Sequence, residues 1–200
     1  MVLLSAAALT ACSSPKTAAP STTTTTSPSA RSTTTLSTSA PTTSTTVPGC
    51  TGSNYLLEML GSEGAAGTNE LTLGFKNTSS ATCSLFGYPG LQLLDGSGND
   101  IATTTVRGGS YSFTNFAPTK VSVGPAATVY FNVAYSDVPT GSESACPTAA
   151  ALQAIAPNTT TALKVTGSFN VCNTGTLTVS PVFGQGSPET QTTAPPSSGH

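Results

Sequence analysis

The sequence predicts an all-β fold between residues 50 and 183, an antiparallel, immunoglobulin-like β-sandwich with two disulfides. Apolar and polar side chains alternate with a period of two, most clearly at 71–76 and 128–135, as expected of strands with one buried face. Gly, Pro, Asn and Ser separate such stretches at intervals of about eight to fifteen residues, a spacing typical of sandwiches. Four of the five cysteines lie in this segment, and an even number favours disulfides.

Residues 1–11 are predicted to be a lipoprotein signal peptide. Residues 2–11 are small or apolar, a run that suits a signal and is too short for the roughly 20 residues that span a bilayer. The sequence "LTAC" at 9–12 resembles the bacterial lipobox, in which small residues precede a cysteine that receives a diacylglyceryl group. We therefore expect a lipid on Cys12 that anchors the protein to a membrane, since two acyl chains anchor stably. The alternative is a chance match within an ordinary cleaved signal, and no Lys or Arg precedes the apolar run.

Residues 12–49 are predicted to be the lipidated cysteine and a linker that precedes the domain. Ser, Thr, Ala and Pro make up nearly all of this stretch, which offers too little apolar surface to offset the entropy lost on ordering. We expect a disordered tether between the anchor and the domain. The similar composition of 184–200 predicts a disordered C-terminal tail.

Further strands are predicted where shorter apolar pairs alternate with polar residues, at 91–93, 121–123, 163–165 and 177–179. The segment "PTAAALQAIAP" at 147–157 has helical propensity, but its terminal prolines permit a short helix or a strand, and we favour the strand.

Two turns follow from local sequence. In "GYPG" at 87–90, Pro89 and Gly90 predict a type II turn with positive φ at Gly90. The segment "DGSGND" at 95–100 has the alternate oxygen donors of a calcium loop, but Asp100 stands where that loop requires glycine. A hairpin loop is therefore expected there.

The four cysteines of the domain are predicted to be structural. They allow three connectivities, of which we favour Cys50 with Cys83 and Cys146 with Cys172. A catalytic thiol needs a base, and the only histidine is the last residue, His200. A zinc site needs closely spaced ligands, which these cysteines do not provide. We therefore expect no catalytic residue, no metal and no cofactor.

The acidic residues of the domain show no spacing that predicts a pair of catalytic carboxylates, and a solvated surface is expected for them. They include Glu58, Glu63, Glu70, Asp137 and Glu143. Charged residues make up 7% of the chain, against about 25% in an average domain, and the net charge is -2. Nucleic acid is not an expected partner, because no basic surface is available to neutralise phosphates.

Several motifs together resemble a known family. They are "GAAGTNELTLGFKNTSSATCSLFGYPGLQLLDGSGNDI", "VSVGPAATVYFNV", "SACP", "LQAIAPNTTTALKV" and "VCN", of which "NTSSATCSLFGYPG" is the most specific. They are similar to domain of unknown function 4232. The resemblance implies an actinobacterial, mycobacterial-type envelope lipoprotein or secreted β-sandwich, and it implies no activity.

Two classes of function are open. The first is a non-catalytic, extracytoplasmic module at the outer face of the membrane or in the cell wall, which we expect to be monomeric and to bind a cell-wall glycan, a lipid or an envelope protein. The second is an envelope-associated hydrolase, for which the sequence offers no active-site constellation. The candidate binding face is "RGGSYSFTNF" at 107–116, with Tyr111, Phe113 and Phe116 as aromatic contacts. The alternative is that Tyr111 and Phe113 are core residues, since they alternate as core residues do.

Overall fold

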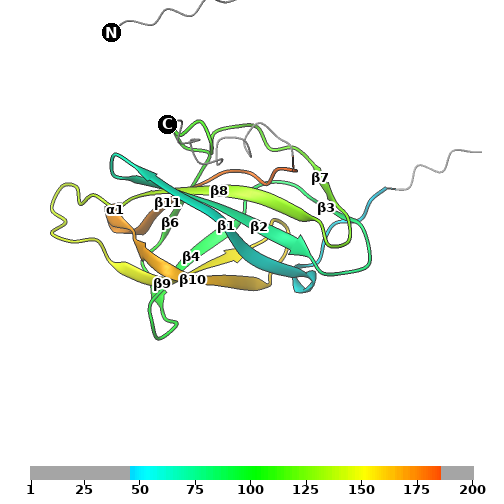
Figure 1. Ribbon diagram of the computed structural model, residues 1–200, viewed down its shortest axis with the longest axis horizontal. Helices are drawn as coiled ribbons and strands as arrows, with labels where there is room; N and C mark the ends of the chain where they lie inside the picture. The colour runs from blue at the N-terminus through cyan, green and yellow to red at the C-terminus, as the bar shows by residue number, and fades with distance from the viewer. Residues whose placement is uncertain (1–45, 186–200) are drawn as a thin grey trace, which may run out of the picture. The chain divides into compact units, whose positions relative to one another are not determined.

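A computed structural model of the chain describes residues 46–185 (Figure 1). The expected signal peptide, the lipidation site Cys12, the linker up to residue 45 and the tail from residue 186 lie outside the described residues.

The described residues form two main sheets and one small sheet, so the predicted all-β fold is confirmed. The larger sheet has the order β1-β2-β8-β11-β6, the second has the order β10-β9-β4-β5, and β3 pairs with β7. The strands are β1 (Tyr55–Ala65), β2 (Thr68–Asn77), β3 (Cys83–Leu85), β4 (Gly90–Leu94), β5 (Asp100–Ile101), β6 (Thr104–Arg107), β7 (Val121–Val123), β8 (Thr128–Ser136), β9 (Thr148–Ile155), β10 (Ala162–Asn170) and β11 (Thr176–Val179). Two short turns, η1 (Gly52–Asn54) and α1 (Cys172–Gly175), complete the elements.

The sheets are antiparallel with one exception, since β11 pairs with β6 in parallel. A parallel pair needs a long connection between its strands, and the whole chain from β7 to β10 separates these two. The immunoglobulin-like topology stays a prediction.

The main core lies between the two large sheets, as the period-two pattern predicts. Residues 71, 73 and 75 of β2 and 129, 131 and 133 of β8 turn their side chains to one buried face. Phe75 and Phe131 stack there with ring centroids 4.9 Å apart. The facing sheet contributes Leu93, Leu152 and Phe169.

The segment 147–157 forms strand β9, so the favoured assignment is confirmed. Strand β9 lies between β4 and β10, and its backbone is hydrogen-bonded on both sides. This pairing outweighs the helical propensity of its alanines.

The two predicted turns have different outcomes. Strands β4 and β5 form the expected hairpin, and the Asp95 carboxylate accepts the N–H groups of Ser97 and Asn99, each at 2.8 Å. The prediction of a type II turn with positive φ at Gly90 is wrong. Gly90 is the first residue of β4, and the residue of this segment with a positive φ, 107°, is Gly87.

The two disulfides expected from the sequence join Cys50 to Cys83 and Cys146 to Cys172. The first fastens the start of the described chain to β3. On either side of this bond, the Ser84 N–H donates to the Pro48 carbonyl at 2.9 Å and the Cys50 N–H donates to the Ser84 carbonyl at 3.1 Å.

The second disulfide lies beside a carboxylate that binds backbone amides. The Glu143 carboxylate accepts the N–H groups of Asn173 at 2.9 Å and Thr174 at 2.8 Å, and these hydrogen bonds lower the pKa of Glu143. Asn173 and Thr174 each have a φ of 55°, a left-handed conformation that is unfavourable for threonine. The long loop before β9 is thus held to α1 by a covalent bond and by charge-assisted hydrogen bonds.

Strands β1 and β2 form a hairpin with a two-residue turn at Ala66 and Gly67, whose φ angles are 50° and 80°. Positive φ at both positions is typical of a type I′ turn, which matches the twist of the flanking strands. The turn sets the register, so that Ala65 lies opposite Thr68 and Glu63 lies opposite Glu70.

Ala66→Asn is expected to raise the free energy of unfolding by about 0.5 kcal/mol, because asparagine tolerates the left-handed conformation better than alanine. Gly67→Ala is the matched opposite change and should destabilise, since its Cβ would clash with Cγ2 of Val138. Urea unfolding followed by circular dichroism measures both. A loss of stability in Ala66→Asn as large as that in Gly67→Ala would show that the turn has another conformation.

Candidate functional site

The larger sheet has an outer face that is also covered. Thr72 of β2 and Asn132 of β8 face away from the main core, yet both are buried. The cover is the segment 108–116, here called the aromatic loop, because the Asn132 side-chain amide donates to the Phe113 carbonyl at 3.0 Å. Asn132 also accepts from the Thr72 hydroxyl at 3.3 Å, and its backbone N–H donates to the Ser180 hydroxyl at 2.8 Å.

The aromatic loop has its own internal hydrogen bonds. Thr114 is completely buried, and its hydroxyl donates to the carbonyls of Gly108 and Tyr111. The N–H groups of Thr114 and Asn115 also donate to the Tyr111 carbonyl, at 3.0 and 2.9 Å, and the Gly108 N–H donates to the Val179 carbonyl at 2.8 Å. The backbone that carries Tyr111 and Phe113 is therefore fixed on the sheet.

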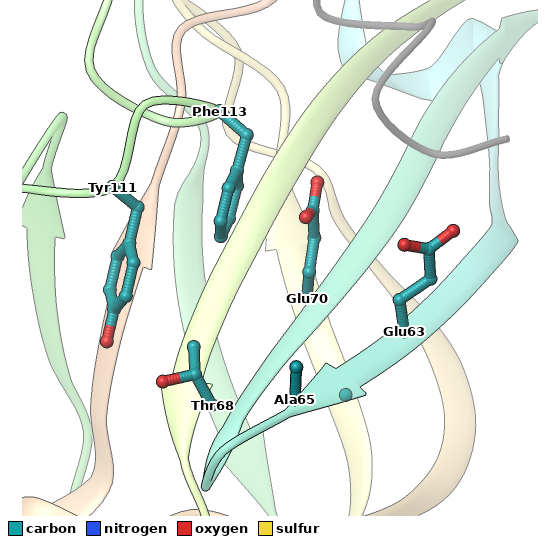
Figure 2. Close-up of a pocket in the computed structure, with 7 residues that line it drawn as sticks. Glu63, Ala65, Thr68, Glu70, Tyr111 and Phe113 are labelled. Carbon is teal, nitrogen blue, oxygen red and sulfur yellow. The ribbon is translucent and has the colours of Figure 1, made fainter. Parts of the chain in front are cut away.

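A pocket of about 610 Å³ lies between the aromatic loop and the β1–β2 hairpin, and we call it the hairpin pocket (Figure 2). Tyr111 and Phe113 extend from the loop toward the hairpin, and their rings stack with centroids 5.3 Å apart and an interplanar angle of 24°. The hairpin contributes Glu63, Gly64, Ala65, Thr68 and Glu70.

The structure brings together two of the three aromatic residues that the sequence suggested. Tyr111 and Phe113 are half-buried, line the hairpin pocket and lie outside the main core. Phe116 does not line this pocket. Its ring packs edge-on against Phe183 at 5.7 Å, and Phe183 in turn stacks on Tyr130.

The pocket also contains a carboxylate pair that the sequence analysis missed. Glu63 and Glu70 are directly opposed on neighbouring antiparallel strands, so their side chains lie on the same face of the hairpin. They are seven positions apart in the sequence, and the two-residue turn between Ala65 and Thr68 brings them opposite each other. The expectation that no two carboxylates are paired is wrong for these two residues, and the expectation of a solvated surface is wrong for Glu70.

The Glu70 carboxylate is partly buried without a hydrogen-bond donor that compensates for the lost water. Its Oε1 atom is buried and has no hydrogen-bond partner, and burial together with the charge of Glu63 raises the pKa of Glu70 to about 7. No basic side chain of the described chain lines the pocket. Lys76 lies 3.6 Å from Glu58, and the Arg107 guanidinium lies 6.0 Å from the ring of Tyr88.

The arrangement has the parts of a binding site, with two stacked rings on one wall and two carboxylates on the other (Figure 2). Residues 46–185 contain no group of three or more His, Cys, Asp or Glu side chains placed to hold a metal ion. In the same residues, no helix has the length and hydropathy that crossing a membrane requires.

Comparison with known proteins gives a family. A family model described as Domain of unknown function (DUF4232) matches residues 50–183. No curated protein matches the sequence. The resemblance found in the sequence is thus confirmed for the family itself.

Glu70→Gln is expected to stabilise the free protein at pH 8 but not at pH 4. The carboxyl titrates near 7 when folded and near 4.5 when unfolded, so the unfolded state loses its proton first and stability falls as the pH rises between these values. Because the side chain is partly solvated, we expect a gain of roughly 1 kcal/mol rather than the full effect of the shift. Thermal unfolding at both pH values measures it, with Glu58→Gln as the control. An equal gain at pH 4 and pH 8 would contradict the assignment.

Proposed function

We propose that this chain, which belongs to the DUF4232 family, is a non-catalytic ligand-binding module of the bacterial cell envelope, and that the hairpin pocket is its binding site. The observation that carries the proposal is the pair of half-buried, stacked rings of Tyr111 and Phe113 on a fixed loop. The volume of about 610 Å³ lies within the roughly 300–1,000 Å³ of small-molecule pockets.

The binding role is supported by the order of the aromatic loop. Tyr111 and Phe113 are carried by a backbone whose carbonyls already have donors, from Thr114 and Asn132. Little conformational freedom remains to be lost on binding, and a rigid aromatic surface binds with a smaller entropic penalty. Aromatic anchors of this kind commonly account for most of the binding energy. The candidate ligands are a cell-wall glycan, a lipid or an envelope protein.

The envelope location is supported by three features of the chain. Its two disulfides are typical of oxidising, extracytoplasmic compartments. The "LTAC" sequence at 9–12 suits lipidation of Cys12, and the Ser/Thr/Ala/Pro-rich linker that follows suits a tether. We place the protein, as a monomer, at the outer face of an actinobacterial cell membrane or in its cell wall.

The second candidate is an envelope-associated hydrolase, which the Glu63–Glu70 pair favours. Glycoside hydrolases use two carboxyl groups, one of them with a raised pKa, and the pKa of Glu70 is raised. In those enzymes the two groups flank the bond that breaks. Glu63 and Glu70 project together from one β-ribbon, an arrangement that suits binding better than cleavage.

Cys12→Ala is expected to abolish lipid anchoring. The full-length protein, expressed in an actinobacterial host, should partition into the detergent phase, and the variant should not, because it lacks the thiol that accepts the diacylglyceryl group. Recovery of the unaltered protein entirely in the aqueous phase would contradict the anchor, and it would leave the binding role to be judged separately.

Tyr111→Ser/Phe113→Ser is expected to abolish capture of the ligand, since it removes the aromatic wall of the pocket. Crosslinking of the full-length protein in intact cells, followed by identification of what is captured, measures this. The matched control is Phe86→Ser, a ring that is 49% exposed and does not line the pocket.

Undiminished capture by a folded double variant would refute the hairpin pocket as the binding site. Hydrolysis of envelope material by the purified protein, eliminated by Glu70→Gln, would instead establish the second candidate.

A further inference from the structure

We propose that the hairpin pocket binds an organic cation with N–H donors, a primary ammonium or guanidinium group at the end of an apolar stem. Glu63 and Glu70 bind the charged group, and the rings of Tyr111 and Phe113 pack against the stem. The inference deepens the proposed function and rests on it, because it names the chemical class that the site accepts.

The first argument is charge. Like charges directly opposite each other on neighbouring strands are unfavourable, and Glu63 and Glu70 are so placed. In the part of the chain that the structure describes, neither carboxylate forms an ion pair and no basic side chain lines the pocket. A positive charge between them removes the repulsion and supplies the missing partner.

The second argument is an unpaired acceptor. Buried polar atoms nearly always have a hydrogen-bond partner, and one without a partner needs an explanation. Oε1 of Glu70 is buried beside the pocket and has none. An occupant that donates an N–H to the Glu70 carboxylate compensates for this loss, and a donor that also carries a charge gives the stronger hydrogen bond.

The third argument is the opposite wall. Ring faces attract cations and pack against the aliphatic stems that carry them. Tyr111 and Phe113 form a stacked pair that faces the hairpin (Figure 2). An alkylammonium or alkylguanidinium group therefore meets carboxylates with its charged end and rings with its stem.

Other occupants fit less well. A calcium ion takes six to eight oxygen ligands, whereas the pocket offers two carboxylates and a wall of rings. A neutral sugar can stack on the rings and donate to Glu70, but it leaves two like charges uncompensated. A quaternary ammonium has no N–H group to donate to the Glu70 carboxylate.

Binding should strengthen as the pH rises through 7, because a cation binds the ionised form of Glu70. The titratable residues that share the pocket with Glu70 are Glu63 from β1 and Tyr111 from the aromatic loop, while on β8 the neighbouring residue is the uncharged Ala134.

Isotope-labelled full-length protein should be titrated with Nα-acetyl-argininamide and Nα-acetyl-lysinamide, with the amide signals of Gly64, Ala65 and Thr68 followed by NMR. Both cations should give saturable shifts at pH 8 and weaker binding at pH 5.5. Nα-acetyl-citrullinamide, the neutral isostere of the arginine probe, should bind at least about tenfold more weakly, and choline should also bind more weakly.

Two variants localise the effect. Glu70→Gln should weaken binding of the arginine probe at least about tenfold, while Glu58→Gln, which changes a carboxylate outside the pocket, should leave it unchanged. Absence of saturable shifts, equal binding of the citrulline probe, or undiminished binding by Glu70→Gln would overturn the inference.

Failure of this inference can be told apart from failure of the proposed function. If Tyr111→Ser/Phe113→Ser abolishes capture in cells and the cationic probes do not bind, the pocket is a binding site for another class of ligand. If the probes bind and capture does not depend on Tyr111 and Phe113, the cation site exists and the proposed function is wrong.

Discussion

The burial of strand β8 on both faces is the constraint on which the rest of the structure depends. Phe131 and Val133 fill the core between the large sheets, while Asn132, on the opposite face, is equally inaccessible. A buried amide needs partners for its donors and its acceptor. Asn132 takes them from β2, through Thr72, and from the aromatic loop, through the Phe113 carbonyl, while its backbone N–H binds Ser180 beyond β11. The polar residue in the centre of the sheet thus determines where the loop lies, and the loop determines where the aromatic rings lie.

The hairpin pocket lies where this cover ends. The Glu70–Ala134 pair lies two residues along β2 from the Thr72–Asn132 pair, on the same face of the sheet. The Glu70 carboxylate has a buried oxygen but no hydrogen-bond partner from the loop. A structure optimised for stability alone would not place a second carboxylate directly opposite. Unfavourable placement of polar groups at a concave site is typical of positions that are kept for a ligand. The same two residues therefore weaken the free protein and give the pocket its chemical character.

The extent of sequence prediction follows from the range of each interaction. The alternation of apolar and polar residues within β2 and β8 is a local pattern, and it predicted the strands. The even number of cysteines can be counted in the sequence, and it predicted the two disulfides. The register of the β1–β2 hairpin was not predicted, because Ala66-Gly67 lacks the Asn-Gly pattern typical of a type I′ turn, and without that register Glu63 and Glu70 look unrelated. Phe116 was grouped with Tyr111 and Phe113 by sequence distance, but its partner is Phe183, 67 positions further along the chain, which no local pattern indicates.

The geometry of β1 relates the pocket to the place where the chain joins the domain. The first disulfide and the backbone hydrogen bonds of Pro48 and Cys50 fix that place beside β3, near the start of β1. Strand β1 has 11 residues and ends at the turn that borders the pocket, as Figure 1 shows for the β1–β2 hairpin. At about 3.3 Å per residue, the strand separates the two by roughly 35 Å. The chain therefore enters the domain at a covalently fastened end, and the hairpin pocket lies at the opposite end of strand β1 from this point.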